Sequence, residues 1–339
     1  TAADKVPPPD KRKIWTVLTN VDYASSDYKN FVEGNATEIN TLFELTNNEV
    51  ADYHRDTDPG DGSTNTRRCA NAAGVIDGTD DDVKGLINFV RGTDYFDYDA
   101  DCNLTETRHN PLGDVYHSQL VVVGAPNAET AFIDSNQESY WRSINGYDAF
   151  ASSNASRKEM IYAGANDGML HAFDAKTGVE KWAFIPPFML GQLPLTINTN
   201  LNQNQPEEKG GTNAIFGVDG SPVQHDIFFK SPHDTAESWH TILIVPYGRG
   251  GNGFSLIDVT DPIQPRHLFS VFNDKIDNKV HVMKHDGETN TFEYIAKRIA
   301  SGFVVGFFVL LDFFCAFAMF VVFLCVSGKV LQESMIWVQ

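Results

Sequence analysis

The chain has 339 residues, a formal net charge of −19 at pH 7 and a sequence pI near 4.8. Hydrophobic residues make up 42% of it, so the chain can bury one large β domain or two smaller domains. The negative charge repels nucleic acid, and the longest basic run is only Lys11-Arg12-Lys13, which excludes nucleic acid from the expected partners.

Residues 1–13 contain Pro7-Pro8-Pro9 and are predicted to be a linker. The sequence begins at Thr1, without the charged and then apolar segments of a signal peptide. Either a signal peptide has been removed or the sequence is a piece of a longer protein, and the linker favours the piece.

Residues 14–115 are the least regular part and are predicted to lead into the main domain. Residues 14–18 have the pattern of a strand, residues 36–45 that of a short helix, and residues 50–68 that of a polar loop. A second helix is predicted over residues 80–91, because three aspartates stand at its start, where the helix dipole favours negative charge. Its apolar stripe has spacings of three and four and consists of Val83, Leu86, Ile87 and Val90.

Two of the four cysteines, Cys69 and Cys102, lie in this irregular part. Neither belongs to a Cys-x-x-Cys pair or to a Cys/His zinc pattern. A disulfide between them would stabilise the fold by roughly 3–4 kcal/mol, and it would imply an oxidising compartment such as the periplasm or cell surface. The alternative is two buried free thiols.

A cluster of acidic residues in the same part has the spacing of a calcium-binding loop. Oxygen-bearing side chains occupy its positions 1, 3, 5 and 7, which are Asp97, Asp99, Asp101 and Asn103. The match is incomplete, because Cys102 replaces the usual glycine and Arg108 the usual final glutamate, although Glu106 is close by. Calcium is therefore a candidate cofactor, and the alternative is a strand with the three aspartates on its solvent face.

Residues 116–300 contain an internal repeat of four short apolar runs, bounded by Gly, Pro, Asp and Asn. The runs of the first unit cover residues 117–123, 160–164, 168–174 and 179–184. Those of the second unit cover residues 220–226, 241–245, 253–258 and 267–270.

Four strands per unit is the composition of a β-propeller blade, whose two faces are apolar and must be covered by neighbours. We therefore predict an all-β fold, a partial β-propeller of four-stranded blades, in preference to a generic β-sandwich. The runs 280–283 and 292–294 are predicted to begin a third blade. Because so few blades cannot close a ring, one flank should expose strand edges and apolar faces.

Residues 301–339 form an apolar tail that is predicted to be helical. The stretch 303–326 is long enough for a transmembrane helix and contains one charge, Asp312, near its middle. The composition changes abruptly in the middle of an expected blade. A membrane anchor, an aberrant end of the sequence and a buried apolar segment therefore all stay open.

Some patterns resemble functional motifs but favour structural roles. The run 248–253 lacks the lysine and the helix of a phosphate-binding loop, so a wide turn between strands is predicted. His117-Ser118 and Asp219-Gly220-Ser221 open the first strand of each unit, where we expect them to tie strand ends together by hydrogen bonds. Other histidines, such as His171, His225 and His240, do not have metal-ligand spacing. We expect them to be ordinary core or surface residues.

Five motifs stand in order at residues 113–126, 161–174, 182–187, 218–223 and 248–262. Together they resemble the propeller domain of the type IV pilus assembly and tip-associated adhesin family, the PilC/PilY proteins. The resemblance covers about residues 83–295. It implies a surface protein that supports pilus extension, opposes retraction and contributes to adhesion, with pilin or minor pilins as partners.

The same resemblance implies export to the cell surface, pilus tip or outer membrane of a Gram-negative bacterium, and an unknown surface or host ligand. Some family members bind calcium in an Asp-rich loop that lies further along the propeller, so that loop is not carried over to this chain. A membrane contact is expected only if residues 303–326 are a genuine anchor.

An enzyme is the alternative. Residues 167–182 also resemble the repeat of pyrroloquinoline quinone dehydrogenases, where the motif ties blades together, but here it occurs once in full and without an adjacent cysteine pair. We therefore expect no catalytic residues. A generic cell-surface propeller scaffold, unconnected with pili, is the third interpretation.

Overall fold

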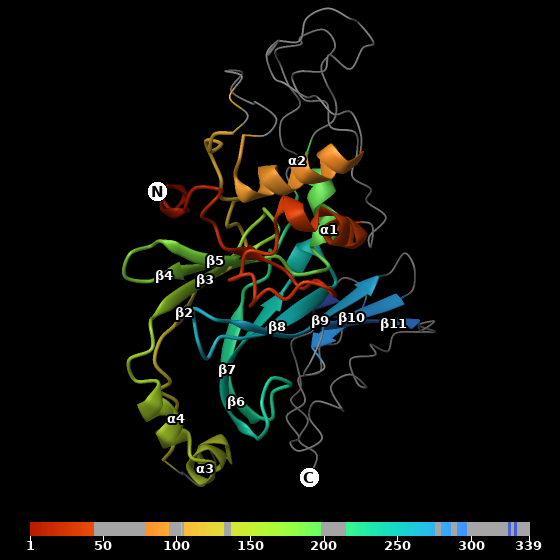
Figure 1. The fold of residues 1–339 in the computed structure, drawn as a ribbon. Helices are drawn as coiled ribbons and strands as arrows, with labels where there is room; N and C mark the ends of the chain where they lie inside the picture. The colour runs from red at the N-terminus through yellow and green to blue at the C-terminus, as the bar shows by residue number, and fades with distance from the viewer. Residues whose placement is uncertain are drawn as a thin grey trace, which may run out of the picture.

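The computed structural model describes residues 1–43, 79–94, 103, 105–131, 137–197, 215–274, 279–285, 290–296, 325–326 and 329–330. Its centre consists of two packed sheets, and two helices near the N-terminus lie above them in Figure 1. The described part is mostly β structure with few helices, which is the fold class that the sequence predicts.

The first sheet has five strands in the order β1-β5-β4-β3-β2. Strands β2 (Val121–Val123), β3 (Met160–Gly164), β4 (Leu170–Asp174) and β5 (Glu180–Phe184) form an antiparallel meander. A further strand, β1 (Ile14–Trp15), comes from the N-terminal segment and pairs with β5 in parallel. The strand predicted near the N-terminus therefore exists, and it adds an outer edge to the first blade.

The second sheet has six antiparallel strands in the order β11-β10-β9-β8-β7-β6. These strands are β6 (Val223–Phe229), β7 (Ser238–Pro246), β8 (Gly253–Asp258), β9 (Arg266–Asp274), β10 (Lys279–His285) and β11 (Asn290–Ala296). The first four match the second predicted unit. The residues that we expected to begin a third blade form β10 and β11, which extend this sheet instead. The reason is that β10 follows β9 closely in the sequence and satisfies its open backbone groups as a hairpin partner.

Both sheets contain the same irregularity. The register between β4 and β5 shifts between Ala172 and Phe173, and the register between β8 and β9 shifts between Leu256 and Ile257. Each shift lies shortly before the aspartate that ends the third strand of its unit. A bulge at the same place in two four-stranded units increases the local twist in both, which supports their interpretation as copies of one blade.

The turn between β4 and β5 follows directly from its sequence. Gly178 has a φ of 71°, a left-handed conformation that glycine adopts without steric cost. The carboxylate of Asp174 accepts hydrogen bonds from the backbone N–H groups of Lys176 and Thr177, at 3.1 and 2.9 Å. Because these interactions are local, the turn could be predicted from the sequence.

The two blades pack closely against each other. Strand β2 contacts β6, so the first strands of both blades lie next to each other. The indole N–H of Trp182 in β5 donates to the carbonyl oxygen of Pro262, which follows β8, at 2.9 Å. One buried apolar cluster includes side chains from both blades and from the N-terminal segment. The two repeats are therefore neighbours that bury each other's faces.

Helices α1 (Ala36–Phe43) and α2 (Thr79–Arg91) contact each other beside the first blade and confirm the two predicted helices. The predicted apolar stripe of α2 is buried. Two more helices, α3 (Gln137–Ile144) and α4 (Tyr147–Ser153), lie between β2 and β3 and were not predicted. The short 3₁₀ segments are Ala3–Lys5, Glu33–Asn35, Leu190–Thr196 and Gly248–Gly250.

The helical insertion α3–α4 packs against the second blade. The indole N–H of Trp239 in β7 donates to the carbonyl oxygen of Asn145 at 2.9 Å. The hydroxyl group of Tyr147 donates to a carboxylate oxygen of Asp226 in β6 at 2.5 Å. The insertion belongs to the first blade and is anchored on the second blade, which adds a further connection between the two blades (Figure 1).

Of the apolar tail, only β12 (Cys325–Val326) and β13 (Lys329–Val330) are described, and they form a short antiparallel pair. The rest of the predicted tail, including residues 303–324, lies outside the described residues, so its predicted helix is untested. None of the helices in the described ranges has the length and apolar character that crossing a bilayer requires.

The close approach of the blades at Gly164 gives a prediction about stability. A Cβ atom at Gly164 would clash with the backbone carbonyl oxygen of Val218 and lie 2.8 Å from Cγ1 of the same residue, in the segment that leads into the second blade. We expect Gly164→Ala to lower the free energy of unfolding by about 1–3 kcal/mol through overpacking, measured by urea denaturation. Gly34→Ala is the matched control, because a Cβ atom there has no neighbour within 4 Å. Equal stability of both variants would contradict the tight packing of the blades.

Candidate functional site

The first strands of the two blades are joined by hydrogen bonds at their beginnings. Nδ1 of His117 lies 2.8 Å from one carboxylate oxygen of Asp219 and 2.9 Å from the other. The backbone N–H of Gln119 donates to the Oγ of Ser221 at 3.0 Å. The expectation that these histidine, aspartate and serine side chains tie strand ends together is therefore confirmed.

Ser118, the other serine in these motifs, also has a structural role. Its Oγ accepts a hydrogen bond from the backbone N–H of Gly164 at 3.0 Å, and it donates to the carbonyl oxygen of Gln119 at 3.3 Å. The hydroxyl group thus connects β3 with the segment before β2. The hydroxyl proton is thus donated to a backbone carbonyl oxygen and not to a base that could activate the serine as a nucleophile.

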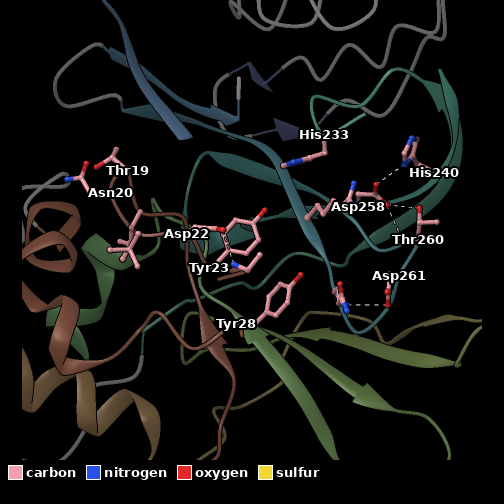
Figure 2. Close-up of a pocket in the computed structure, with 15 residues that line it drawn as sticks. Thr19, Asn20, Asp22, Tyr23, Tyr28, His233, His240, Asp258, Thr260 and Asp261 are labelled. Carbon is pink, nitrogen blue, oxygen red and sulfur yellow. Dashed lines mark hydrogen bonds and ion pairs between the residues drawn. The ribbon is translucent and has the colours of Figure 1, made fainter. Parts of the chain in front are cut away.

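A cavity of about 570 Å³ lies between the N-terminal loop 18–28 and the second blade (Figure 2). The loop contributes residues 18–24 and Tyr28 to its lining. The second blade contributes residues from the β6–β7 connection, from β7, from the end of β8, from the β8–β9 connection and from the start of β9. These residues are His233, His240, Asp258, Thr260, Asp261, Gln264 and Arg266. A volume of this size is typical of sites for small molecules or single side chains.

Two tyrosines form the loop side of this cavity. The ring of Trp15 lies 4.6 Å from that of Tyr23 and 5.6 Å from that of Tyr28, measured between centroids. The hydroxyl oxygen of Tyr23 accepts a hydrogen bond from the backbone N–H of His267 at 2.9 Å. Burial raises the pKa of Tyr23 to about 12 and also raises the pKa of Tyr28, so both hydroxyl groups keep their protons at neutral pH.

On the opposite side, His240 is held by three side chains. Its Nδ1 lies 2.8 Å from a carboxylate oxygen of Asp258. Its Nε2 lies 2.8 Å from the Oγ of Ser238 and 3.1 Å from a carboxylate oxygen of Asp234. The order Ser–His–Asp resembles a catalytic triad, but Asp234 competes with Ser238 for the same ring nitrogen. The arrangement is therefore better described as a polar network that joins β7 to β8 than as a general base with its nucleophile.

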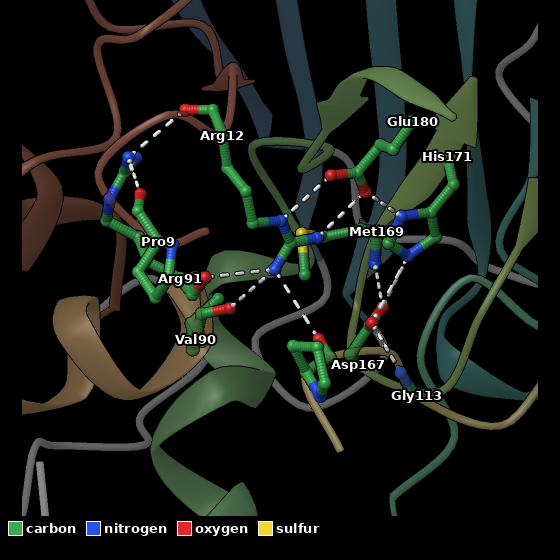
Figure 3. A network of polar contacts seen from close by, with 10 residues as sticks. Pro9, Arg12, Val90, Arg91, Gly113, Asp167, Met169, His171 and Glu180 are labelled. Carbon is green, nitrogen blue, oxygen red and sulfur yellow. Dashed lines mark hydrogen bonds and ion pairs between the residues drawn. The ribbon is translucent and has the colours of Figure 1, made fainter. Parts of the chain in front are cut away.

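A buried ionic network connects the N-terminal segment to the first blade (Figure 3). The guanidinium group of Arg12 donates two hydrogen bonds to the carboxylate of Glu180 in β5, at 2.9 and 2.8 Å. The same carboxylate lies 2.7 Å from Nδ1 of His171 in β4. Nε2 of His171 lies 3.2 Å from Asp167, which accepts a hydrogen bond from the backbone N–H of Gly113 at 2.8 Å.

Arg12 also holds the irregular N-terminal part in place. It is fully buried, and its guanidinium group donates to the carbonyl oxygens of Arg91 at 3.1 Å and Pro111 at 3.4 Å. Arg91 in turn donates to the carbonyl oxygens of Phe31 at 2.9 Å and Arg12 at 3.1 Å. The end of the predicted linker is therefore an integral part of the fold, because a buried guanidinium group requires this complete set of acceptors.

The charges in this network stabilise one another. Burial alone would lower the pKa of His171, but the carboxylates of Asp167 and Glu180 outweigh it and raise the pKa to about 9. Burial alone would raise the pKa of Glu180, but Arg12 and His171 outweigh it and lower the pKa to about 2. His171 is thus expected to carry a proton at neutral pH between two carboxylates.

Most of the predicted site residues lie outside the described part of the chain. Asp97, Asp99 and Asp101 lie outside the described residues, and so do Cys69 and Cys102, which leaves the calcium loop and the disulfide as predictions. Asn103 is described. Its amide group donates to Glu106 at 3.1 Å, and its oxygen accepts a hydrogen bond from the hydroxyl group of Thr105 at 3.0 Å. Within the described ranges, no group of three or more His, Cys, Asp or Glu side chains is arranged to hold a metal ion.

The ends of the segment that carries the acidic cluster lie close together. The backbone N–H of Asp94 donates to the carbonyl oxygen of Glu106, and that of Arg108 to the carbonyl oxygen of Gly92, each at 2.9 Å. The segment is therefore closed at its base by a short antiparallel bridge, formed by Thr93 and Thr107.

Sequence reasoning missed both the cavity and the ionic network. Arg12 stands in a run of three basic residues that suggests a solvated surface, and Glu180 is followed directly by Lys181, so neither residue indicates a buried ion pair on its own. The cavity depends on how the loop 18–28 lies against the second blade, which no local pattern encodes.

Comparison with known proteins identifies relatives of the two blades. A family model described as the PilY1 beta-propeller domain matches residues 112–297. A type IV pilus biogenesis factor PilY1 homolog of Xylella fastidiosa is 35% identical over 183 residues, which are 54% of this chain and 13% of that protein. The type IV pilus biogenesis factor PilY1 of Pseudomonas aeruginosa strain UCBPP-PA14 is 34% identical over 183 residues, 53% of this chain and 14% of that protein.

A further match extends beyond the blades. Another alignment with a PilY1 homolog of Xylella fastidiosa gives 29% identity over 267 residues, 74% of this chain and 15% of that protein. Among solved structures, the C-terminal domain of Pseudomonas aeruginosa PilY1 is 24% identical, with a TM-score of 0.31, and covers 53% of this chain and 37% of that chain. The chain spans about one seventh of the length of the curated relatives that it matches.

Removal of the buried cation tests the ionic network. We expect Arg12→Met to lower the free energy of unfolding by about 3–5 kcal/mol, because it leaves Glu180 buried without its main partner. The matched control is Lys11→Met, which removes an exposed ion pair with Asp10 and should cost less than about 1 kcal/mol. Urea denaturation at neutral pH measures both values, and a loss below about 1 kcal/mol for Arg12→Met would contradict the network.

The raised pKa of His171 gives a prediction about pH. The ordinary pKa of His171 is 6.5, and its pKa in the folded chain is about 9. Its contribution to the free energy of unfolding is therefore complete below a pH of about 6.5 and is lost as the pH rises through about 9. We expect stability to fall between about pH 7 and about pH 9, and to fall less in His171→Gln than in the parent chain. The exposed His109→Gln is the control. Identical slopes in all three proteins would show that His171 is not held as a cation.

Proposed function

This chain belongs to the PilY1 β-propeller family, and we propose that it is part of a type IV pilus biogenesis factor whose blades act as a non-enzymatic scaffold. The observation that carries the proposal is the match of the family model across both four-stranded blades and the hairpin that extends the second. The curated relatives that match just over half of this chain are named type IV pilus biogenesis factors.

The use of the polar residues in the repeat motif supports a non-enzymatic role. The motif at residues 167–182, which also resembles quinone dehydrogenase repeats, contains Asp167, His171 and Glu180. Each of these side chains is engaged in the ionic network that joins the first blade to Arg12 and Gly113. A motif whose acids and base are used in this way stabilises the blade and leaves none of them available to a substrate.

The proposed partners are pilin or minor pilins, and the proposed location is the cell surface, at the pilus tip or outer membrane. The formal net charge of −19 favours solubility and disfavours attraction to anionic surfaces. Contribution to surface adhesion, through a ligand that is unknown, is part of the same proposal. The calcium loop at Asp97 to Asn103 and the Cys69–Cys102 disulfide belong to it as predictions from the sequence alone.

The proposal is tested in the bacterium that carries the gene. We expect the full-length protein to co-purify with pili sheared from the cells, and deletion of the gene to reduce the number of surface pili counted by electron microscopy. Re-expression of the full-length protein should restore them. An unchanged pilus number after deletion would contradict the proposal, and turnover of an alcohol with added quinone and a dye acceptor would contradict the non-enzymatic role.

A further inference from the structure

The cavity between the loop 18–28 and the second blade contains a hydroxyl group without a partner. Tyr28 is only 6% exposed, and its hydroxyl group makes no hydrogen bond with any of the described residues, whereas that of Tyr23 accepts one from His267. Figure 2 shows the Tyr28 side chain directed into the space between the loop and the second blade. Because the rest of the Tyr28 side chain is buried and its hydroxyl group opens onto the cavity, this group is available to a ligand there.

The backbone holds Tyr28 in this position. Asp27 and Tyr28 have φ values of 53° and 61°, which is uncommon for two successive residues other than glycine. The backbone N–H of Tyr28 donates to the carbonyl oxygen of Tyr23 at 2.8 Å. These contacts position the backbone, and the ring of Tyr28 packs against that of Trp15, which reduces the entropy that binding would cost.

The charges around the cavity favour a cation. The exposed carboxylates of Asp22 and Asp261 lie on its two sides. One oxygen of Asp261 accepts hydrogen bonds from the backbone N–H groups of Ile263 and Gln264, at 2.9 and 3.3 Å. The other oxygen makes no hydrogen bond within the described part of the chain and is open to a ligand. These backbone bonds fix the carboxylate at the edge of the cavity.

The remaining charged groups of the lining are already paired. Arg266 lies 3.5 Å from Asp234, and Asp258 lies 2.8 Å from His240. His233 faces the carbonyl oxygen of His267 at 3.1 Å. The exposed carboxylates of the lining are therefore those of Asp22 and Asp261, and their charge has the same sign as the net charge of the whole chain.

We propose that this cavity binds the cationic side chain of a partner peptide, a lysine or an arginine, between Tyr28 on the loop and Asp261 on the second blade. An ammonium or guanidinium group carries only donors, and the cavity offers the acceptors that it needs in a carboxylate oxygen and a hydroxyl oxygen. The volume of about 570 Å³ accommodates a long side chain with part of its backbone.

Other classes of ligand fit less well. An anion would be repelled by the two exposed carboxylates. Stacking of a sugar ring requires an exposed aromatic face, but Tyr23 is 3% exposed and Tyr28 is 6% exposed. The inference does not depend on the pilus role, because it concerns the cavity alone and its test measures binding in solution.

The test uses Nα-acetyl-arginine amide as the probe, titrated into the whole chain and followed by calorimetry. Nα-acetyl-citrulline amide is the neutral control of nearly the same shape. We expect the arginine derivative to bind at least about tenfold more tightly than the citrulline derivative, because only it gains charge-assisted hydrogen bonds. Its affinity should fall as the salt concentration rises.

Two conservative variants locate the site. Tyr28→Phe removes only the hydroxyl group, and Asp261→Asn removes the charge while keeping an oxygen for its backbone hydrogen bonds. We expect each to weaken binding of the arginine derivative by about fivefold or more. The matched controls, Tyr116→Phe and Asp114→Asn, change exposed residues outside the cavity and should leave the affinity unchanged.

Several results would overturn the inference. These are equal affinities for the arginine and citrulline derivatives, no heat of binding with either, or unchanged binding in the Asp261→Asn variant. If Tyr28→Phe fails to fold, Asp261→Asn still decides the outcome, because its side chain is exposed and its variant keeps the backbone hydrogen bonds.

Discussion

The structure depends on one constraint, which is that each four-stranded blade is apolar on both faces and cannot remain uncovered. Trp182 of the first blade is buried and reaches Pro262 of the second, and a single apolar cluster extends through both blades. The N-terminal segment covers the outer edge of the first blade, where β1 pairs with β5. Burial of this kind of surface, at roughly 25 cal/mol per Å², is the main source of stability for such a fold.

Polar contacts then determine how the covered faces are aligned. Arg12 connects the N-terminal segment to Glu180, and His117 connects the first blade to Asp219 at the beginning of the second. Neither contact is a large source of net stability, because burying the charges of Arg12 and Glu180 is costly in itself and His117 is partly exposed. Their effect is on alignment, because the apolar faces can pack in only one relative position if these polar groups are to keep their hydrogen bonds. The cavity beside Tyr28 is a consequence of this alignment, because its two walls come from segments far apart in the sequence.

The parts that could be predicted from the sequence are those determined locally. The turn from Asp174 to Gly178 and the apolar stripe of α2 follow from a few adjacent residues, and the strands of both blades follow from alternating apolar runs. The parts that could not be predicted depend on pairing between distant segments. Strand β10 has the same pattern whether it begins a third blade or extends the second, and only its pairing with β9 decides between them. Helices α3 and α4 occur in an insertion whose hydrogen-bond partners, Trp239 and Asp226, lie in the other blade.

The central claim is that the two repeats form one packed unit, and amide hydrogen exchange tests it most directly. The indole N–H of Trp182 and the backbone N–H of Val218 both donate across the boundary between the blades, to Pro262 and Ala165. The account predicts that these two protons are protected to the same degree as the amides at the centres of β4 and β8. Free exchange of both protons, while the strand amides within each blade stay protected, would show that the blades do not pack on each other and would contradict the account.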